Sequence, residues 1–422
     1  MVINKLQPAF LFNYLITIIF IVWCITPILQ RNIHPLLLLI IVIIWFVSVV
    51  LLGYKFKLKI KPIILAVVCF ITILIMQYFR VRPVTSLGNL LTAILAFYPI
   101  FIFYYIRKNT KYNIDVLKGI LGLIILVTAF NAVHNIFLLI GDPTASKYLG
   151  GSVEIAMTTY QITNVATPPF VAFTILLFPI FWYYFENRKG FQKLFYLLIA
   201  LVTIIFAYLA ASSLALIALS IEIVMLLVFK IKNGYNRLFL VMFIIGLLLL
   251  TIIAREPLGQ MLVSLSYDVD NYFYSQRIGE VGHAMMGISH EGSFSARMQD
   301  TYISIKSFMR SPLWGVGFYF SQNINQTGIG MHSQIIDDLA RYGLIGFGLL
   351  GYIYYSWIKN NFYLAKSREI NRIVTSILIA IVFLALFNMF SNVVYGLLIF
   401  FVIPLFVYTN SYEEIEINCI QE

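Results

Sequence analysis

Long runs of apolar residues recur along almost the whole chain and alternate with short polar segments. A run of about 20 apolar residues is enough to cross a bilayer as an α-helix. We therefore predict about twelve transmembrane helices. Their expected ranges are 9–29, 35–54, 62–79, 86–106, 117–140, 166–185, 194–210, 214–230, 238–254, 343–358, 373–390 and 392–409.

Two of these helices are separated from a neighbour only by a short polar patch. A single helix over residues 194–229 would be about 54 Å long, whereas the hydrocarbon core is about 30 Å thick. We therefore place a turn at Ala211-Ser212-Ser213. The polar patch at 388–392 is expected to separate the last two helices in the same way.

Composition excludes a soluble protein. The 422 residues are 61% hydrophobic and 11% charged, with a mean hydropathy of +0.91, whereas soluble domains carry about 25% charged residues. The segment 9–29 is too long for a cleavable signal and lacks a small-residue cleavage site. The three cysteines show neither metal-site spacing nor a plausible disulfide pair. We expect an all-α polytopic membrane protein.

The net charge of +11 does not indicate a nucleic-acid partner, because the basic residues lie in short loops rather than on one face. Short loops rich in Lys and Arg favour the cytoplasmic side, and such loops alternate along this chain. Both termini are therefore expected in the cytoplasm, with a large extracytoplasmic loop between helices nine and ten. The predicted units are a transmembrane region 1–254, an extracytoplasmic loop 255–341, a transmembrane region 342–410 and an acidic cytoplasmic tail 411–422.

The large loop has internal order. Its stretch GEVGHAMMGISHEG (279–292) is glycine-rich and predicts a mobile segment. Ser295 is expected to cap a helix that Pro312 ends. In that helix Met298, Tyr302, Ile305 and Met309 form an apolar stripe, and Arg297, Asp300, Ser304 and Ser307 lie towards the other side. Such a helix suits the outer membrane interface.

A second short helix, HSQIIDDLARYG, begins after Gly330 and is expected to end with Gly343 as its C-cap. The ordered pieces Arg297, SPLWGVG (311–317), His332-Ser333 and RYGLIGF (341–347) resemble the O-antigen polymerase and ligase family of the Wzy and WaaL type. The large loop between helices nine and ten is also similar to that of the family. The resemblance extends over about fifty residues by motif and over the whole chain by topology.

The resemblance implies a metal-independent glycosyltransferase, without a cofactor, in a bacterial cytoplasmic membrane. Its donor would be a sugar chain on undecaprenyl pyrophosphate at the outer face. A hydroxyl group of an acceptor sugar attacks the anomeric carbon, and the lipid pyrophosphate leaves. Expected partners are this lipid-linked glycan and membrane lipids; a chain-length regulator and a flippase are candidates.

Two residues are predicted to be catalytic. Histidine titrates in the range needed to accept a hydroxyl proton, which favours His332 as the general base over a loop histidine without a role. Arginine binds phosphate through two parallel hydrogen bonds, which favours Arg297 as the pyrophosphate ligand. The alternative for Arg297 is an ion pair with Asp300 along its own helix.

Seven further residues are predicted to bind substrate. Where many family members carry Ser-Arg-Gly, this chain has Ser212-Ser213-Leu214, so an arginine is missing there and other cations are candidates to replace it. Glycines let the backbone approach a carbohydrate. For Arg341, neighbours Asp337 and Asp338 favour a structural ion pair over substrate binding. The predicted substrate-binding residues are Arg80, Arg82, Lys147, Arg310, Gly315, Gly317 and Arg341.

The leading functional hypothesis is a polymerase of polysaccharide repeat units. A ligase that moves finished glycan to a lipid or wall acceptor uses the same chemistry. A transporter or flippase of lipid-linked oligosaccharide would show paired charges and broken helices near the midplane, in two related halves. Glu222, near the middle of the eighth helix, and some prolines are the only such signs. A carboxylate there is usually functional or paired.

Overall fold

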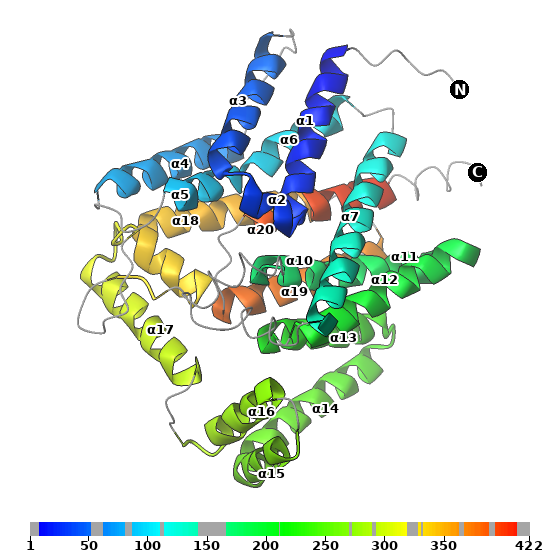
Figure 1. The fold of residues 1–422 in the computed structure, drawn as a ribbon, viewed down its shortest axis with the longest axis vertical. Helices are drawn as coiled ribbons and strands as arrows, with labels where there is room; N and C mark the ends of the chain where they lie inside the picture. The colour runs from blue at the N-terminus through cyan, green and yellow to red at the C-terminus, as the bar shows by residue number, and fades with distance from the viewer. Residues whose placement is uncertain are drawn as a thin grey trace.

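In the computed structural model of the protein (Figure 1), every secondary-structure element among the described residues is helical, which confirms the all-α prediction. The described residues are 8–51, 62–80, 87–109, 114–141, 166–210, 212–269, 272–288, 293–318, 328–330, 332–362, 367–387 and 393–411. Two segments noted above, Ala211 and residues 388–392, lie outside these ranges.

Within the described residues, each predicted transmembrane range falls on helices; residues 52–54, 86, 388–390 and 392 of these ranges lie outside the described residues. The helix that would have covered 194–229 is broken where the turn was predicted, between α12 and α13. The helices before the large loop are α1 (Pro8–Ile25), α2 (Pro27–Asn32), α3 (Pro35–Leu51), α4 (Pro62–Arg80), α5 (Leu87–Leu95), α6 (Tyr98–Asn109), α7 (Ile114–Gly141), α10 (Pro168–Leu176), α11 (Phe178–Asn187), α12 (Gly190–Leu209), α13 (Ser213–Lys230) and α14 (Gly234–Ile253).

Two predicted helices are each divided into two. The chain breaks at Ala96–Phe97, just before Pro99, and at Leu177, just before Pro179. Proline lacks an N–H group, and its ring clashes with the carbonyl four residues earlier. The prolines therefore end α5 and α10 and start α6 and α11.

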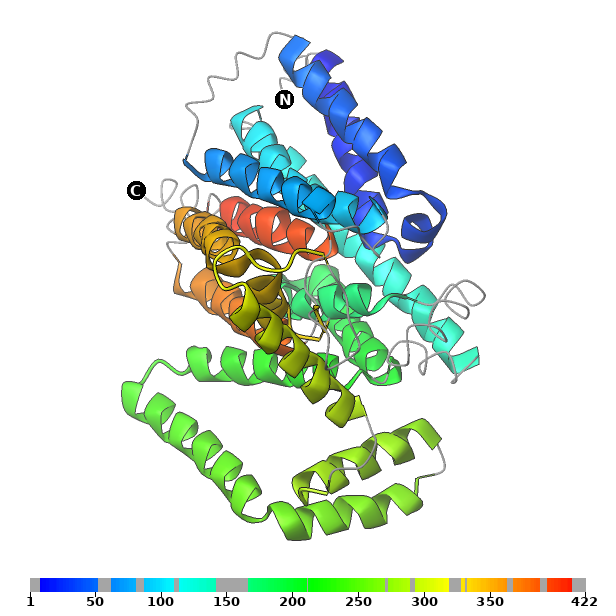
Figure 2. The ribbon, with the colours of Figure 1, turned by 90° about the vertical axis from the view of Figure 1, so that its left-hand side faces the viewer.

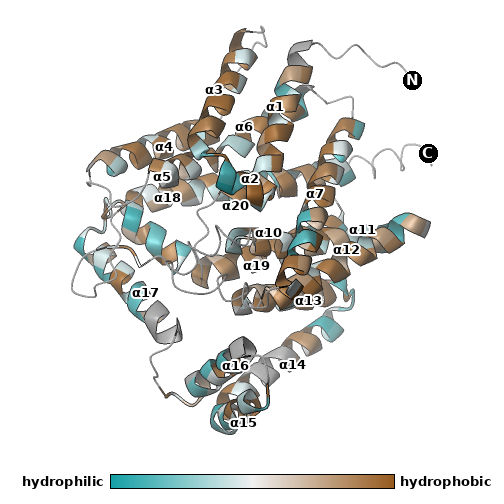
Figure 3. Ribbon diagram, viewed as in Figure 1, coloured by the Kyte–Doolittle hydropathy of each residue, from teal (hydrophilic) through white to brown (hydrophobic). Residues whose placement is uncertain are grey.

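The chain is a polytopic membrane protein. Within the described residues, seven helical segments are long and apolar enough to cross a bilayer, and two shorter apolar helices, Leu11–Ile25 and Pro35–Leu51, accompany them. Large apolar side chains face outward from the bundle: Phe79 is 77% and Phe130 73% exposed. Figure 3 shows hydrophobic residues along the bundle helices and more hydrophilic ones on α17 (Ser293–Arg310) and the first half of α18 (Gln334–Phe362).

The last helical segment forms the centre of the bundle. Its apolar stretch Val393–Ser411 is completely buried, and it contacts α1, α5, α6 and α10. One turn of it, η1 (Leu398–Val402), is a π-helix. The carbonyl of Ile399 in that turn accepts a hydrogen bond from Trp357 Nε1 of α18 at 3.1 Å. The remaining helices near the C-terminus are α19 (Arg368–Phe387) and α20 (Val393–Leu397).

Several helix ends next to loops that were predicted to be cytoplasmic contact one another at one end of the bundle. Glu186 of α11 accepts from Lys230 of α13 at 2.8 Å and from Arg372 of α19 at 2.5 Å. Asn410 Nδ2 donates to the Tyr184 hydroxyl at 3.2 Å. Because these helix ends meet one another, the packing is consistent with the prediction that their loops lie on one side of the membrane. That this side is the cytoplasm stays a prediction.

The described part of the large loop contains three helices in addition to the start of α18. Figure 2 shows α14 leading away from the bundle to a hairpin of α15 (Arg255–Tyr267) and α16 (Tyr272–Met285). The prediction of a mobile segment over 279–292 was wrong for 279–285, which belong to α16; residues 289–292 lie outside the described ranges. A Cβ on Gly282 would meet the Gly259 carbonyl at 2.7 Å. These glycines therefore serve close helix packing.

Candidate active site

The candidate site begins on the polar face of α17. That helix starts at Ser293, two residues before the predicted cap, and ends at Arg310 before Pro312. Its side chains Ser304 and Ser307 are fully buried. Ser307 Oγ accepts from the Gly328 amide at 2.7 Å, and Ser304 Oγ accepts from the Gly330 amide at 2.9 Å. Two serines one turn apart thus hold the segment 328–330, which precedes His332.

The close approach of this segment to α17 requires glycine at position 330. A Cβ on Gly330 would lie 2.1 Å from the carbonyl oxygen of Asp300. No side chain can be accommodated at that distance, so only glycine lets this segment lie against the helix backbone. Gly330 thus brings the segment before His332 onto α17.

His332 is brought against Asp300. Its Nε2 lies 2.9 Å from Oδ2 of Asp300, and the two side chains are 38% and 18% exposed. Partial burial raises the pKa of Asp300, and the neighbouring His332 opposes that rise. A carboxylate bound to one ring nitrogen fixes the orientation of an imidazole and stabilises its protonated form. In the sequence interpretation, Asp300 was considered only as the partner of Arg297 in the alternative to pyrophosphate binding.

The start of α18 is closed by a reciprocal cap next to His332. Ser333 Oγ accepts from the Ile336 amide at 3.4 Å, and Asp337 Oδ2 accepts from the Ser333 amide at 3.2 Å. Asp337 Oδ1 accepts from Ser304 Oγ at 2.5 Å. Burial raises the pKa of Asp337, and the Ser304 hydrogen bond opposes the rise. The backbone on both sides of His332 is therefore attached to α17 through Ser304.

Gly343 breaks α18 as predicted. Its φ of +62° and ψ of −174° interrupt the helical hydrogen bonding. The segment that contains SPLWGVG fills the break: the Val316 amide donates to Ala340 O at 2.8 Å, and the Leu344 amide donates to Pro312 O at 2.8 Å. SPLWGVG and RYGLIGF, which are separated in sequence, are thus joined by backbone hydrogen bonds.

Asp338 and Arg341 are buried on the bundle side of the short helix, where they form the predicted charge cluster. Arg341 Nη1 lies 3.5 Å from Asp338 Oδ1, with side chains 3% and 7% exposed. The guanidinium also lies 5.3 Å from the centre of the Phe318 ring. Burial raises the pKa of Asp338 to about 6 although Arg341 opposes the shift. These contacts favour the structural interpretation of Arg341.

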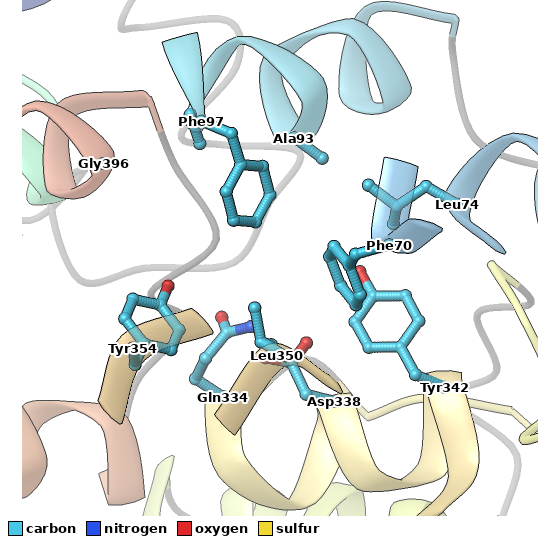
Figure 4. Close-up of a pocket in the computed structure, with 11 residues that line it drawn as sticks. Phe70, Leu74, Ala93, Phe97, Gln334, Asp338, Tyr342, Leu350, Tyr354 and Gly396 are labelled. Atoms are coloured by element: carbon cyan, nitrogen blue, oxygen red, sulfur yellow. The ribbon is translucent and has the colours of Figure 1, made fainter. Parts of the chain in front are cut away.

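A small cavity adjoins this cluster. Figure 4 shows residues of α4, α5, α18 and α20 around it, with Gln334, Asp338 and Tyr354 supplying polar atoms. Its volume is about 40 Å³, enough for one or more water-sized groups. Gln334, which lines the cavity, follows His332 by two residues in the sequence. Its other lining residues are Phe70, Leu74, Ala93, Ala96, Phe97, Tyr342, Leu350 and Gly396.

The family comparison agrees with the elements that build this site. Residues 197–351 match the family Wzy_C, described as O-Antigen ligase. The chain carries an O-antigen ligase domain. No curated protein matches the chain. The domain runs from α12 into α18 and includes α17, the SPLWGVG segment, His332 and the break at Gly343.

The O-antigen ligase domain places some of the predicted site residues apart from His332. Arg310 is exposed and ends α17, ten residues beyond Asp300, which corresponds to about 15 Å along a helix. Arg297 lies one turn before Asp300 on α17, and Arg80 ends α4; the side chains of both are outside the described part of the structure. Arg82 and Lys147 are outside it altogether.

Gly315 and Gly317 have a backbone role in the domain. Both have positive φ, +69° and +74°, a conformation that favours glycine. The Gly317 amide donates to Arg341 O at 3.0 Å. Their predicted role at a carbohydrate stays a prediction. Among the described residues, no three His, Cys, Asp or Glu side chains come together as metal ligands would.

Sequence analysis did not identify Asp300, Ser304 and Ser307 as site residues. The signal was present, because these residues were placed on one side of the predicted helix. What the pattern could not show is that this side packs against residues 328–337.

Glu222, also within the domain, is fully buried on α13, and neither carboxylate oxygen has a hydrogen-bond partner among the described residues.

Proposed function

We propose that this protein is a glycosyltransferase that polymerises undecaprenyl-pyrophosphate-linked repeat units into surface polysaccharide at the outer face of a bacterial cytoplasmic membrane. The observation that supports this most is the His332–Asp300 pair, at 2.9 Å, within the O-antigen ligase domain. The pair is partly exposed, so a sugar hydroxyl can reach the imidazole. It supplies the proton acceptor that glycosyl transfer to a hydroxyl needs.

The residues suggest the following reaction. His332 accepts the proton of the acceptor hydroxyl as its oxygen forms a bond to the anomeric carbon of the donor. The bond between that carbon and the pyrophosphate oxygen breaks, and its electrons leave with the lipid pyrophosphate. Asp300 stabilises the imidazolium that forms. Arg297, one turn earlier on α17, is the proposed ligand of the leaving pyrophosphate, with Arg80, Arg82, Lys147 and Arg310 as further candidates.

The proposal includes the predicted topology. Twelve crossings put both termini in the cytoplasm and α15, α16, α17 and the start of α18 outside. The lipid-linked donor is then presented on the same side as His332. The domain division is the one predicted from sequence, with 255–341 as the extracytoplasmic catalytic loop. A chain-length regulator and a flippase remain candidate partners.

A ligase is the second candidate, because the matched family is described as O-Antigen ligase. The two functions differ in the acceptor rather than in the chemistry at the anomeric carbon. Deletion of the gene followed by gel analysis of surface glycan separates them. Loss of a polymerase leaves a single repeat unit on its acceptor, whereas loss of a ligase leaves full-length chains without their anchor.

The direct test is polymerisation in vitro with purified lipid-linked repeat units. We expect His332→Ala to reduce the rate by about 10²–10⁴, the usual contribution of general acid–base catalysis, at unchanged protein level. His134→Ala is the matched control, because His134 is an exposed histidine on α7. Elongation by His332→Ala at the wild-type rate would refute the assignment. Activity retained by His332→Gln alone would mean that hydrogen bonding, not proton transfer, is the role.

Arg297 is tested by substitution that keeps its charge. Lysine cannot form the two parallel hydrogen bonds of a guanidinium. Arg297→Lys and Arg297→Ala should therefore both lose most activity at normal protein levels. If both variants keep wild-type activity, Arg297 does not bind the pyrophosphate.

A further inference from the structure

Helix α17 exposes its apolar stripe and buries polar residues, whereas most surface helices pack their apolar side inward. The apolar stripe points away from the protein: Met298 is 59%, Tyr302 53% and Met309 70% exposed. Ser304 and Ser307, on the opposite face, are fully buried, and Ile303 is 1% exposed. The buried serines therefore help to attach α17 to the protein, and its apolar stripe is exposed from Met298 to Met309.

The segment after α17 extends the apolar surface. Leu313 and Trp314 are 55% and 58% exposed. The carbonyl of Trp314 accepts a hydrogen bond from Gln77 Nε2 at 2.6 Å. Gln77 lies in the last turn of α4, a membrane-spanning helix. The bond therefore places Trp314 at the depth where α4 leaves the membrane.

Further exposed apolar side chains lie near Gln77 at the end of α4. Met76 and Phe79, on either side of Gln77 in sequence, are 66% and 77% exposed. Tryptophan and tyrosine are enriched where hydrocarbon meets headgroups. Arg310 is exposed at the end of α17, where its charge suits lipid phosphate. Each of these features fits a phospholipid surface.

We propose that α17, together with Leu313 and Trp314, is an in-plane membrane anchor that inserts its stripe into the interface of the leaflet at the end of α4. Amphipathic helices lie this way with their apolar face about 5–10 Å into the boundary between headgroups and acyl chains. The occupant of the stripe is the phospholipid of the surrounding bilayer, because the Gln77–Trp314 bond joins this apolar surface to the end of a membrane-spanning helix.

The anchor fixes the height of the candidate site. Asp300 lies towards the face of α17 that the stripe does not occupy, and His332 is bound to it at 2.9 Å. A helix is about 10–12 Å across with its side chains. Asp300 and His332 are therefore held on the water side of the anchor, level with the headgroups. A pyrophosphate linked to a membrane lipid lies at the same height.

The test measures depth rather than activity, so its outcome does not depend on the proposed reaction. A spin label is attached at Met309→Cys or Tyr302→Cys, in a chain whose native cysteines are replaced by alanine. The protein is reconstituted in vesicles of phosphatidylcholine and phosphatidylglycerol. Power saturation compares collision with oxygen, which enters the bilayer, and with a water-soluble nickel chelate, which does not.

We expect labels at 302 and 309 to collide mainly with oxygen. A label at Asn233→Cys, an exposed site before α14, is the aqueous control and should collide mainly with the chelate. If the labels at 302 and 309 behave like the control, the anchor is refuted. Spin–spin broadening at 309 would show a second copy on the stripe. Shielding that requires added undecaprenyl phosphate would show the substrate tail there. Either result would also overturn the proposal.

Discussion

Gly315 and Gly343 pack backbone against backbone. A Cβ on Gly315 would lie 2.6 Å from the Gly343 amide nitrogen, and a Cβ on Gly343 would lie 2.6 Å from the Gly315 amide nitrogen. Both residues also have positive φ. The contact joins the SPLWGVG segment to the point where α18 breaks, and so sets the direction of the short helix that follows His332.

Alanine at either glycine is therefore expected to destabilise the protein. A positive φ costs a non-glycine residue about 1–3 kcal/mol, and an overpacked contact costs a similar amount. Thermal unfolding in detergent should show a lower midpoint for Gly315→Ala and Gly343→Ala. Gly348→Ala is the control, because a Cβ there meets nothing within 4 Å. An unchanged midpoint in both test variants would show that the contact is not tight.

Ser304 is expected to position His332 rather than to react. Its hydroxyl donates to Asp337 and accepts from the Gly330 amide, so Ser304→Ala leaves two buried partners unsatisfied. Each such group costs about 1–3 kcal/mol.

We expect Ser304→Ala to lower both the unfolding midpoint and the turnover number, and Ser304→Thr to restore the turnover number in part. Ser220→Ala is the control, since Ser220 is exposed and, among the described residues, its hydroxyl bonds to the Leu216 carbonyl of its own helix. A lower midpoint with unchanged turnover would leave Ser304 with a structural role alone.

Membrane topology gives a third prediction. Basic loops place Asn233 in the cytoplasm and Tyr267, at the end of α15, outside. A cysteine at Tyr267, which is 83% exposed, should react with an impermeant maleimide on intact cells. A cysteine at Asn233 should react only after permeabilisation. Cys419, in the predicted cytoplasmic tail, is replaced in both. Reversed labelling would put the O-antigen ligase domain's loop on the wrong side for the proposed donor.

The helices of the bundle could be predicted because each is a long apolar run, a local property of the sequence. The break at Gly343 could be predicted for a similar reason, since the helical pattern stops at a glycine. The internal breaks before Pro99 and Pro179 were missed because the apolar run continues through them, although each proline is a local signal. The helix α16 was missed because Gly279 and Gly282 suggested mobility rather than close packing.

The candidate site could be predicted only in part. His332 was found through the motif around it, and Asp337, Asp338 and Arg341 through their helical spacing. Its partner Asp300 could not be assigned, because the contact joins two helices that are separated by the SPLWGVG and glycine-rich segments. Local spacing offered only Arg297 as a partner for Asp300, as an alternative to pyrophosphate binding. The close approach of Gly330 to Asp300 decides the pairing, and such tertiary contacts leave no periodic signal.

Asp338 gives a prediction for pH. Its pKa is raised to about 6 by burial, above the ordinary aspartate value of about 3.9. The folded protein therefore holds this proton more tightly than the unfolded chain does. The resulting stability is fully present below about pH 4 and is lost as pH rises through about 6.

Asp338→Asn should remove this pH dependence, so that the difference in unfolding midpoint between pH 4.5 and pH 7 becomes smaller than in wild type. Because Arg341 then loses its nearest carboxylate, the variant need not be more stable at pH 7. The comparison is therefore the change with pH and not the absolute midpoint. Asp268→Asn, at the exposed end of α15, is the control. An unchanged pH dependence in Asp338→Asn would show that another group titrates.

Asp300 provides the sharpest test of how His332 works. Asparagine keeps the shape of the side chain and a hydrogen bond to Nε2, but it cannot stabilise a protonated imidazole. If His332 accepts a proton, Asp300→Asn should reduce the turnover number about 10–100-fold, part of the usual contribution of general acid–base catalysis. The KM for the lipid-linked acceptor should change little, because binding is not affected. The loss should also be absent in a His332→Ala background, since the two residues act as one unit. A double variant whose losses add independently would mean that Asp300 acts without His332, and the general base would have to be another residue.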